Sequence, residues 1–103
     1  MKTRELEEKL AGRNLKRCGI IERREGGDLG GLIERAVFAP GSFTIRWWHD
    51  GFPRTTTFDD HAWSYEISDD RMTLHMIRTA TDRRNFDAPW RTANLYVVTL
   101  PTI

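Results

Sequence analysis

Cysteine is nearly missing from this sequence, since Cys18 is the only one among 103 residues. A single thiol cannot form an intrachain disulfide, and it cannot supply the several thiolates of a cysteine-based zinc site. Long apolar runs are missing as well, and the N-terminal segment MKTRELEEKLAGR carries charges where a secretory signal has its apolar region. These absences predict a cytoplasmic chain with no disulfide framework and no membrane partner.

Net charge is also small, at +1, because 16 basic side chains offset 15 acidic ones. Such a balance argues against a polyanionic partner, so nucleic acid is not the expected ligand. Hydrophobic residues, by contrast, make up 39% of the chain and aromatic residues 11%. A chain of this size and composition predicts one soluble, folded domain that spans residues 1–103.

Two segments near the N-terminus have clear local signals. Residues 1–13 predict a short helix, with Thr3 as a candidate N-cap and Leu6 and Leu10 on one apolar edge. The glycine-rich run GGDLGG at residues 26–31 predicts a loop between strands. A phosphate-binding Walker loop needs a lysine and then Ser or Thr after its last glycine, and that pattern is not present here.

From residue 17 onward, apolar and polar residues alternate with the period of two that is typical of strands. The predicted strands cover residues 17–23, 32–39, 43–49, 52–58, 63–67, 72–79 and 94–100. Residues 80–93 have no steady period and contain Pro89, so we expect a long loop there. The continuous β-prone run at 94–100 predicts a strand that is buried on both faces or closes the sheet.

The dipeptide Asp50-Gly51 is the sharpest local signal in the chain. Between two strands it predicts a type I′ hairpin, because both turn positions need a positive φ. In the resulting register Trp47 faces Arg54. Pro53 cannot donate a hydrogen bond to a neighbouring strand, so the tip of this hairpin is expected either to lie at an edge of the sheet or to fray.

Seven strands joined mostly by short turns form an antiparallel meander, which tends to curl and close because closure removes exposed edges. We therefore predict a mainly β chain in which a meander closes into a small β-barrel over residues 17–100, with a short N-terminal helix at 1–13. An open sheet with the helix packed on one face is the alternative.

Three segments of the sequence resemble small lipocalin-like (calycin) proteins: LAGRNLKRCGIIE, AVFAPGSFTI and HAWSYEISDDRMTLHM. The resemblance covers residues 9–77, with Asn14 where the family has a tryptophan and Met72 where it has a leucine. It implies a small-molecule pocket inside a lipocalin-like barrel. Relatives use such a pocket for carriage, isomerisation, cyclisation or decarboxylation.

The predicted inner face of the sheet combines aromatic and apolar side chains with a few polar ones. Its candidate ligand-binding residues are Phe43, Trp47, Arg54, Phe58, Trp63, Leu74 and Met76. Its candidate catalytic residues, which would orient a ligand or stabilise an enolate-like intermediate, are His49, Tyr65 and Arg78. The same residues also fit a plain core, although two arginines inside a core need partners.

The three histidines show no metal-ligand spacing, so we expect neither a metal nor a cofactor. The leading hypothesis is a barrel that binds an apolar small molecule, acting as an isomerase or cyclase if it is an enzyme. The alternative is a non-enzymatic protein-binding module, such as an inhibitor or regulatory subunit encoded by a mobile element. Its interface anchors would be Trp47, Trp48 and Trp90. A homodimer is compatible with either function.

Overall fold

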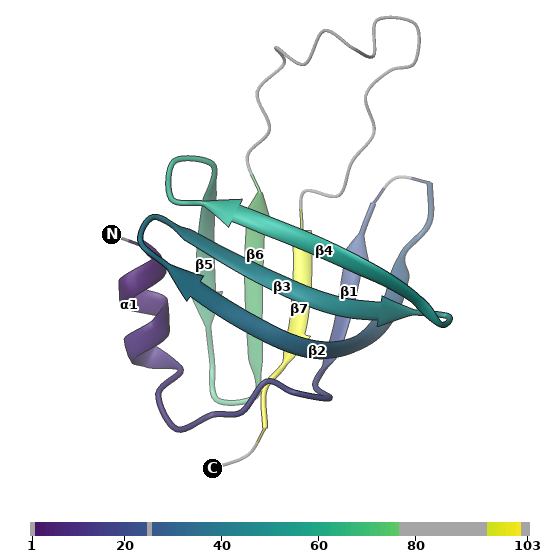
Figure 1. Ribbon diagram of the computed structural model, residues 1–103, viewed down its shortest axis with the longest axis horizontal. Helices are drawn as coiled ribbons and strands as arrows, with labels where there is room; N and C mark the ends of the chain where they lie inside the picture. Colours follow the sequence, from purple (N-terminus) through teal and green to yellow (C-terminus); the bar gives the residue numbers. More distant parts are fainter. Residues whose placement is uncertain (1, 25, 77–94, 102–103) are drawn as a thin grey trace, which may run out of the picture.

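The computed structural model describes residues 2–24, 26–76 and 95–101, which form one helix and one antiparallel sheet (Figure 1). The elements are α1 (Lys2–Lys9), β1 (Gly19–Arg23), β2 (Leu29–Ala39), β3 (Ser42–His49), β4 (Phe52–Asp59), β5 (Trp63–Ile67), β6 (Arg71–Met76) and β7 (Leu95–Thr99). Their order in the sheet is β4-β3-β2-β1-β7-β6-β5. The predicted mainly β fold with a short N-terminal helix is confirmed, while the loop predicted at 80–93 lies outside the described residues.

The sheet follows the predicted meander except between β4 and β5, which are its two edges. The first strand pairs with the last, because β1 lies beside β7. In Figure 1, β2, β3 and β4 cross in front of β1, β5, β6 and β7, so the sheet folds over on itself. Phe58 of β4 meets Trp63 of β5 at 6.0 Å and Tyr96 of β7 at 5.2 Å between ring centroids. The two halves therefore share one core, but the sheet is not closed into a barrel.

The β3–β4 hairpin forms as predicted. Asp50 and Gly51 have φ values of 49° and 81°, which are the positive values that the turn requires. Trp47 pairs with Arg54 in the predicted register. Because β4 is an edge strand, the proline at position 53 interrupts no central ladder.

The glycine-rich run at 26–31 is a loop only in its first half, so the prediction was wrong for the second half. The turn lies at Gly27, with a φ of 122°, and β2 already begins at Leu29. Gly31 is needed inside the strand, because a Cβ there would lie 2.0 Å from the carbonyl oxygen of Trp48. This glycine lets β3 approach closely instead of making a turn.

Two other strands differ from the prediction in detail. β1 begins two residues late, because Arg17 has a φ of 68° and the Cys18 amide donates to the carbonyl of Leu15 at 3.0 Å in a tight turn. β7 lies between β1 and β6 and so connects the two parts of the sheet. Its fully buried residues alternate, at Tyr96 and Val98, so one face is buried and not both.

Helix α1 is fastened to the turn between β4 and β5. The buried side chain of Leu6 faces the sheet, while the amide and hydroxyl of Thr3 donate to Oδ1 of Asp60 at 3.0 and 2.5 Å. The ammonium group of Lys2 donates to the carbonyl of Trp63 at 2.5 Å. Thr3 is therefore inside the helix and not its N-cap, since Asp60 supplies the capping oxygen from a distant turn.

Acid is expected to loosen this attachment. The hydrogen bond from the Thr3 hydroxyl is the main cause that lowers the pKa of Asp60 from its ordinary value of 3.8. A carboxyl with a lowered folded-state pKa contributes stability above its unfolded pKa and loses it as the pH falls through the folded value. The free energy of unfolding should therefore drop more steeply below about pH 4 in the wild type than in Asp60→Asn, measured by urea titration. The matched control is Asp59→Asn, whose exposed side chain should leave the wild-type pH profile unchanged; parallel profiles for the wild type and Asp60→Asn would contradict this account.

Candidate functional site

Six of the seven predicted ligand-binding residues lie together in the hydrophobic core. Five have no exposed surface, and Met76 retains 9%. The other five are Phe43, Trp47, Phe58, Trp63 and Leu74. Their rings contact one another, as Phe43 does with Phe58 at 5.9 Å and with Trp63 at 6.2 Å. The structure brings these side chains to one face as predicted, with the burial and ring contacts of packed core residues.

Arg54, the seventh residue, forms an ion pair with Glu22, a residue that was not predicted as part of the site. Its Nη2 donates to Glu22 at 2.9 and 3.4 Å from the two carboxylate oxygens, and the Glu22 side chain is only 5% exposed. The guanidinium also lies 5.2 Å from the ring centroid of Trp47, whose indole N–H donates to the Thr56 hydroxyl at 3.1 Å. Within the described residues the buried Arg54 Nε has no hydrogen-bond partner. The Arg54 side chain is 38% exposed, so it lies at the edge of the core, where one buried carboxylate is its ion-pair partner.

Two of the three predicted catalytic residues, His49 and Tyr65, lie in the described part of the chain, and they contact different residues there. His49 Nδ1 lies 2.7 Å from the carbonyl oxygen of Gly30, at the β3 end of the hairpin. Tyr65, on β5, contacts the ring of Trp63 at 5.6 Å and the ammonium group of Lys9 at 5.3 Å. Arg78 lies outside the described residues. His49 and Tyr65 therefore lie in different surroundings, and the contacts described for them do not bring them into one site.

In the described ranges there is no group of three or more His, Cys, Asp or Glu side chains arranged to hold a metal ion. The one helix seen there is too short and too polar to cross a membrane.

Cys18 is a free, half-buried thiol, and burial raises its pKa. A raised pKa keeps the thiol protonated at neutral pH, which disfavours a role as nucleophile.

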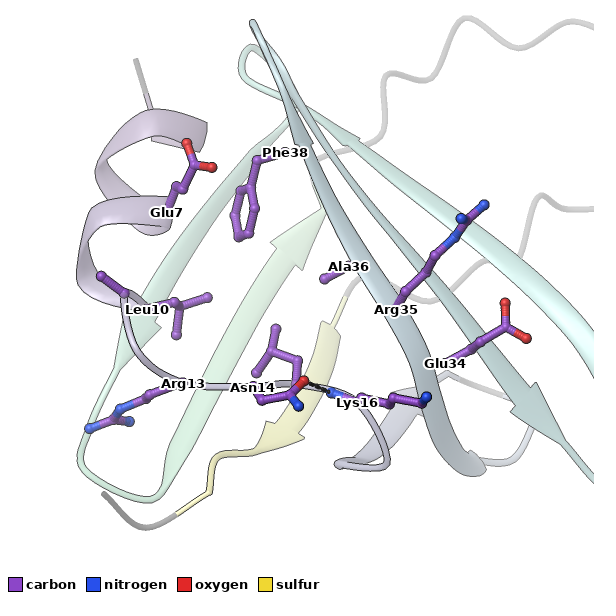
Figure 2. Close-up of a pocket in the computed structure, with 11 residues that line it drawn as sticks. Glu7, Leu10, Arg13, Asn14, Lys16, Glu34, Arg35, Ala36 and Phe38 are labelled. Atoms are coloured by element: carbon purple, nitrogen blue, oxygen red, sulfur yellow. Dashed lines mark hydrogen bonds between the residues drawn. The ribbon is translucent and has the colours of Figure 1, made fainter.

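A pocket of about 380 Å³ lies between α1, the segment that follows it and β2 (Figure 2). Its apolar lining consists of Leu10, Ala11, Leu15, Ala36 and Phe38. Its polar lining consists of Glu7, Arg13, Asn14, Lys16, Glu34 and Arg35. A second pocket of about 410 Å³ shares Glu7 and Phe38 with the first and adds Thr3, Arg4, Ala39 and Pro40. We call the two together the α1–β2 groove.

The groove exists because β1 is much shorter than β2. β1 pairs with β2 only as far as Leu32, after which the backbone of Ile33 bonds to Arg17 and Cys18. A register shift between Ile33 and Arg35 then bends β2. From residue 34 to 39 the strand keeps β3 on one side and the groove on the other. Alternate backbone groups of this stretch therefore point toward the groove.

Small and large side chains shape the interior of the groove. Ala36 occupies an inward position on β2, opposite Ile45 of β3, and leaves space where a larger residue would fill it. Phe38 stacks on Phe43 at 4.6 Å and so connects the groove to the core. In Figure 2, Phe38 and Leu10 both extend into the space between the strand and the helix. The groove thus combines an apolar floor with a charged rim, as ligand pockets commonly do.

No family model, curated protein or solved structure matches this chain. The lipocalin-like resemblance therefore stays a prediction, and the site has to be argued from its own geometry. The sequence did contain two signals for the groove. Leu15 continues the apolar edge of Leu6 and Leu10 beyond the predicted helix, and an alanine stands at position 36 in the alternating strand. These residues form a groove only because β1 is shorter than β2, and local sequence patterns do not specify that difference in length.

Proposed function

We propose that the protein binds a small, partly apolar molecule in the α1–β2 groove. The observation that carries this proposal is the pocket of about 380 Å³ with Leu10, Leu15, Ala36 and Phe38 on its floor. Its volume falls within the range of about 300–1,000 Å³ that is typical of small-molecule sites. The proposal keeps the ligand class predicted from the sequence and moves the site from the inner aromatic face to the groove.

The proposal also keeps the predicted relationship to lipocalin-like proteins. It is supported by the strand order, which would be that of an up-and-down barrel if β4 also paired with β5. Isomerisation or cyclisation stays a prediction. Of the residues that would carry it, His49 and Tyr65 are not among those that line the groove, and Arg78 lies outside the described residues.

Filling the groove from either wall should weaken ligand binding. We expect Ala36→Phe on β2, and separately Ala11→Phe on the segment after α1, to weaken binding of the neutral fluorescent probe N-phenyl-1-naphthylamine about tenfold or more. Each new ring would occupy space that the probe needs. The measurement is a fluorescence titration, with thermal unfolding to show that each variant is folded.

The matched control is Val37→Phe, which adds the same ring to the next residue of β2. Val37 is 47% exposed and lies on the outer face, away from the groove. Its probe affinity should stay within about twofold of the wild type, as expected for a surface change remote from the site. Equal binding by all four proteins, or no binding by the wild type, would disprove the proposed function.

Protein binding is the second candidate function, and one observation favours it. Leu32 and Trp48 stand opposite each other on the outer face of β2 and β3 and are 55% and 37% exposed. Phe52, which pairs with His49 beside the β3–β4 turn, is also 70% exposed. Exposed pairs of large apolar side chains, such as Leu32 with Trp48, are typical of interaction surfaces. Of the predicted anchors, Trp48 is accessible and Trp47 is fully buried, while Trp90 lies outside the described residues.

A further inference from the structure

The α1–β2 groove follows an unpaired edge of the sheet. At Ile33 the pairing with the first strand still continues, because the Ile33 N–H donates to the carbonyl of Cys18 at 2.9 Å and its own carbonyl accepts from Arg17 at 2.7 Å. Arg17 has a φ of 68°, so the chain before it does not extend along β2. From residue 34 to 39, β2 therefore has β3 on one side and no strand of the described chain on the other.

The backbone groups that this edge presents belong to Ala36 and Phe38. Ala39 and Ser42 flank the two-residue turn between β2 and β3, so they exchange the first hydrogen bonds of that hairpin. Bonded pairs alternate with unbonded ones, so Val37 also bonds to β3, while the N–H and C=O groups of Ala36 and Phe38 point to the groove. Within the described ranges, no hydrogen bond reaches these four groups from the groove side.

The two pockets of the groove run along this edge. Together they are lined by β2 and its turn from Glu34 to Pro40. Side chains alternate between the faces of a strand, and the lining includes both Ala36 of the inner face and Arg35 of the outer face. Figure 2 shows Ala36 and Phe38 on the side of β2 that faces α1, with Arg35 and Glu34 extending from the other side. A space lined from both faces of one strand reaches the edge of that strand.

The groove also has room for the side chains of an added strand. Every second side chain of such a strand would lie on the inner face, beside Ala36 and Phe38. There it would meet Leu10 and Leu15, which are 4% and 6% exposed and line the same pocket. Because alanine is small, the space next to position 36 suits an apolar side chain. The intervening side chains would lie beside the exposed Val37 on the outer face.

We infer that the ligand of the groove is a short peptide in an extended conformation, which adds a strand to the free edge of β2. It runs antiparallel to β2, as the strand pairs of the described sheet do, and exchanges hydrogen bonds with Ala36 and Phe38. The edge is open only from residue 34 to 39, which limits the bound strand to about six residues. This inference rests on the proposed function, since it names the chemical class of the ligand for the same groove. Strand addition takes its affinity from main-chain hydrogen bonds and its selectivity from alternate side chains.

Methylated peptides test the inference through the alternation of its hydrogen bonds. The probe is Ac-Thr-Val-Thr-Val-Thr-NH₂, whose valines would pair with Ala36 and Phe38, and we expect a dissociation constant below about 1 mM. Methylation of both valine amides removes the donors that face β2 and should weaken binding about tenfold or more. The matched control has methyl groups on the amides of the second and third threonines, which point away from β2, and its affinity should change less than about threefold. The affinities are measured by NMR titration of the isotope-labelled protein.

Amide hydrogen exchange of the protein locates the bound peptide. In the free protein, the N–H groups of Ala36 and Phe38 should exchange about tenfold or more faster than that of Val37, which bonds to β3. A saturating amount of the probe peptide should slow exchange at Ala36 and Phe38 much more than at Val37. Val37 is thus an internal control on the same strand.

Each outcome of these experiments decides between the proposals. Equal binding of the two methylated peptides would overturn strand addition, and so would slowed exchange that leaves out Ala36 and Phe38. If N-phenyl-1-naphthylamine binds to the groove and the probe peptide does not bind, the inference is wrong while the proposed function stands. If neither binds, the proposed function fails as well.

Discussion

Gly31→Ala is expected to destabilise the protein by about 3 kcal/mol or more, the upper range for added volume in a packed site. The new Cβ would lie 2.0 Å from the carbonyl oxygen of Trp48 and 2.8 Å from the ring of Trp47. A side chain can rotate away from such an overlap, but the Trp48 carbonyl belongs to the backbone of β3. Relief therefore requires β2 and β3 to separate where they are paired through Ile33 and Trp47.

Gly30→Ala is the matched control for this experiment. A Cβ at Gly30 would meet nothing within 4 Å, and the residue does not have a positive φ. The substitution should leave stability unchanged or raise it by up to about 1 kcal/mol, because alanine lowers the conformational freedom of the unfolded chain. Urea unfolding of both variants measures the difference. If the two substitutions had equal effects, the close approach of β3 to Gly31 would be wrong.

Trp47→Ala should cost about 3–5 kcal/mol of unfolding free energy, as large-to-small changes of buried aromatic residues do. Trp47 has no exposed surface. Its removal would open a cavity beside Ile33, take the hydrogen-bond donor from the buried Thr56 hydroxyl and remove the ring on which Arg54 lies.

The adjacent Trp48→Ala controls for the loss of a tryptophan as such. Trp48 is 37% exposed on the outer face, and its indole bonds to the exposed Glu34. We expect a loss of about 1 kcal/mol or less, because surface contacts of this kind contribute little. Both variants are compared by urea unfolding monitored by far-UV circular dichroism. A Trp48→Ala loss as large as that of Trp47→Ala would mean that the inner and outer faces of β3 have been confused.

The hairpin of β3 and β4 was predictable because its signal is local. Asp50-Gly51 sets the turn type, and the turn type sets the register of every pair behind it, including Trp47 with Arg54. That Gly31 lies in a strand was not predictable in the same way. A glycine is needed there because the backbone of β3 approaches closely, and nothing within a few residues of Gly31 distinguishes it from the turn glycine at position 27.

The groove was beyond local prediction for a similar reason. It depends on where β1 stops pairing with β2, and hence on a difference in length between strands whose ends were themselves predicted only to within a few residues. Glu22 could have been assigned to the inner face from its alternation with the buried Ile20. Its pairing with Arg54, 32 residues away, needed the fold.

One wall of the groove, helix α1, is held in place by contacts with residues that are distant in the sequence. The contacts that fasten α1 join Thr3 to Asp60 and Lys2 to Trp63, across 57 and 61 positions of the chain. Helix α1 can therefore be anchored only once the β4–β5 turn has formed, and β1 gains its second neighbour only when β7 joins the sheet. Long-range closures of this kind are characteristic of slow folding. We expect the α1–β2 groove to form late in folding, after these long-range contacts have been made.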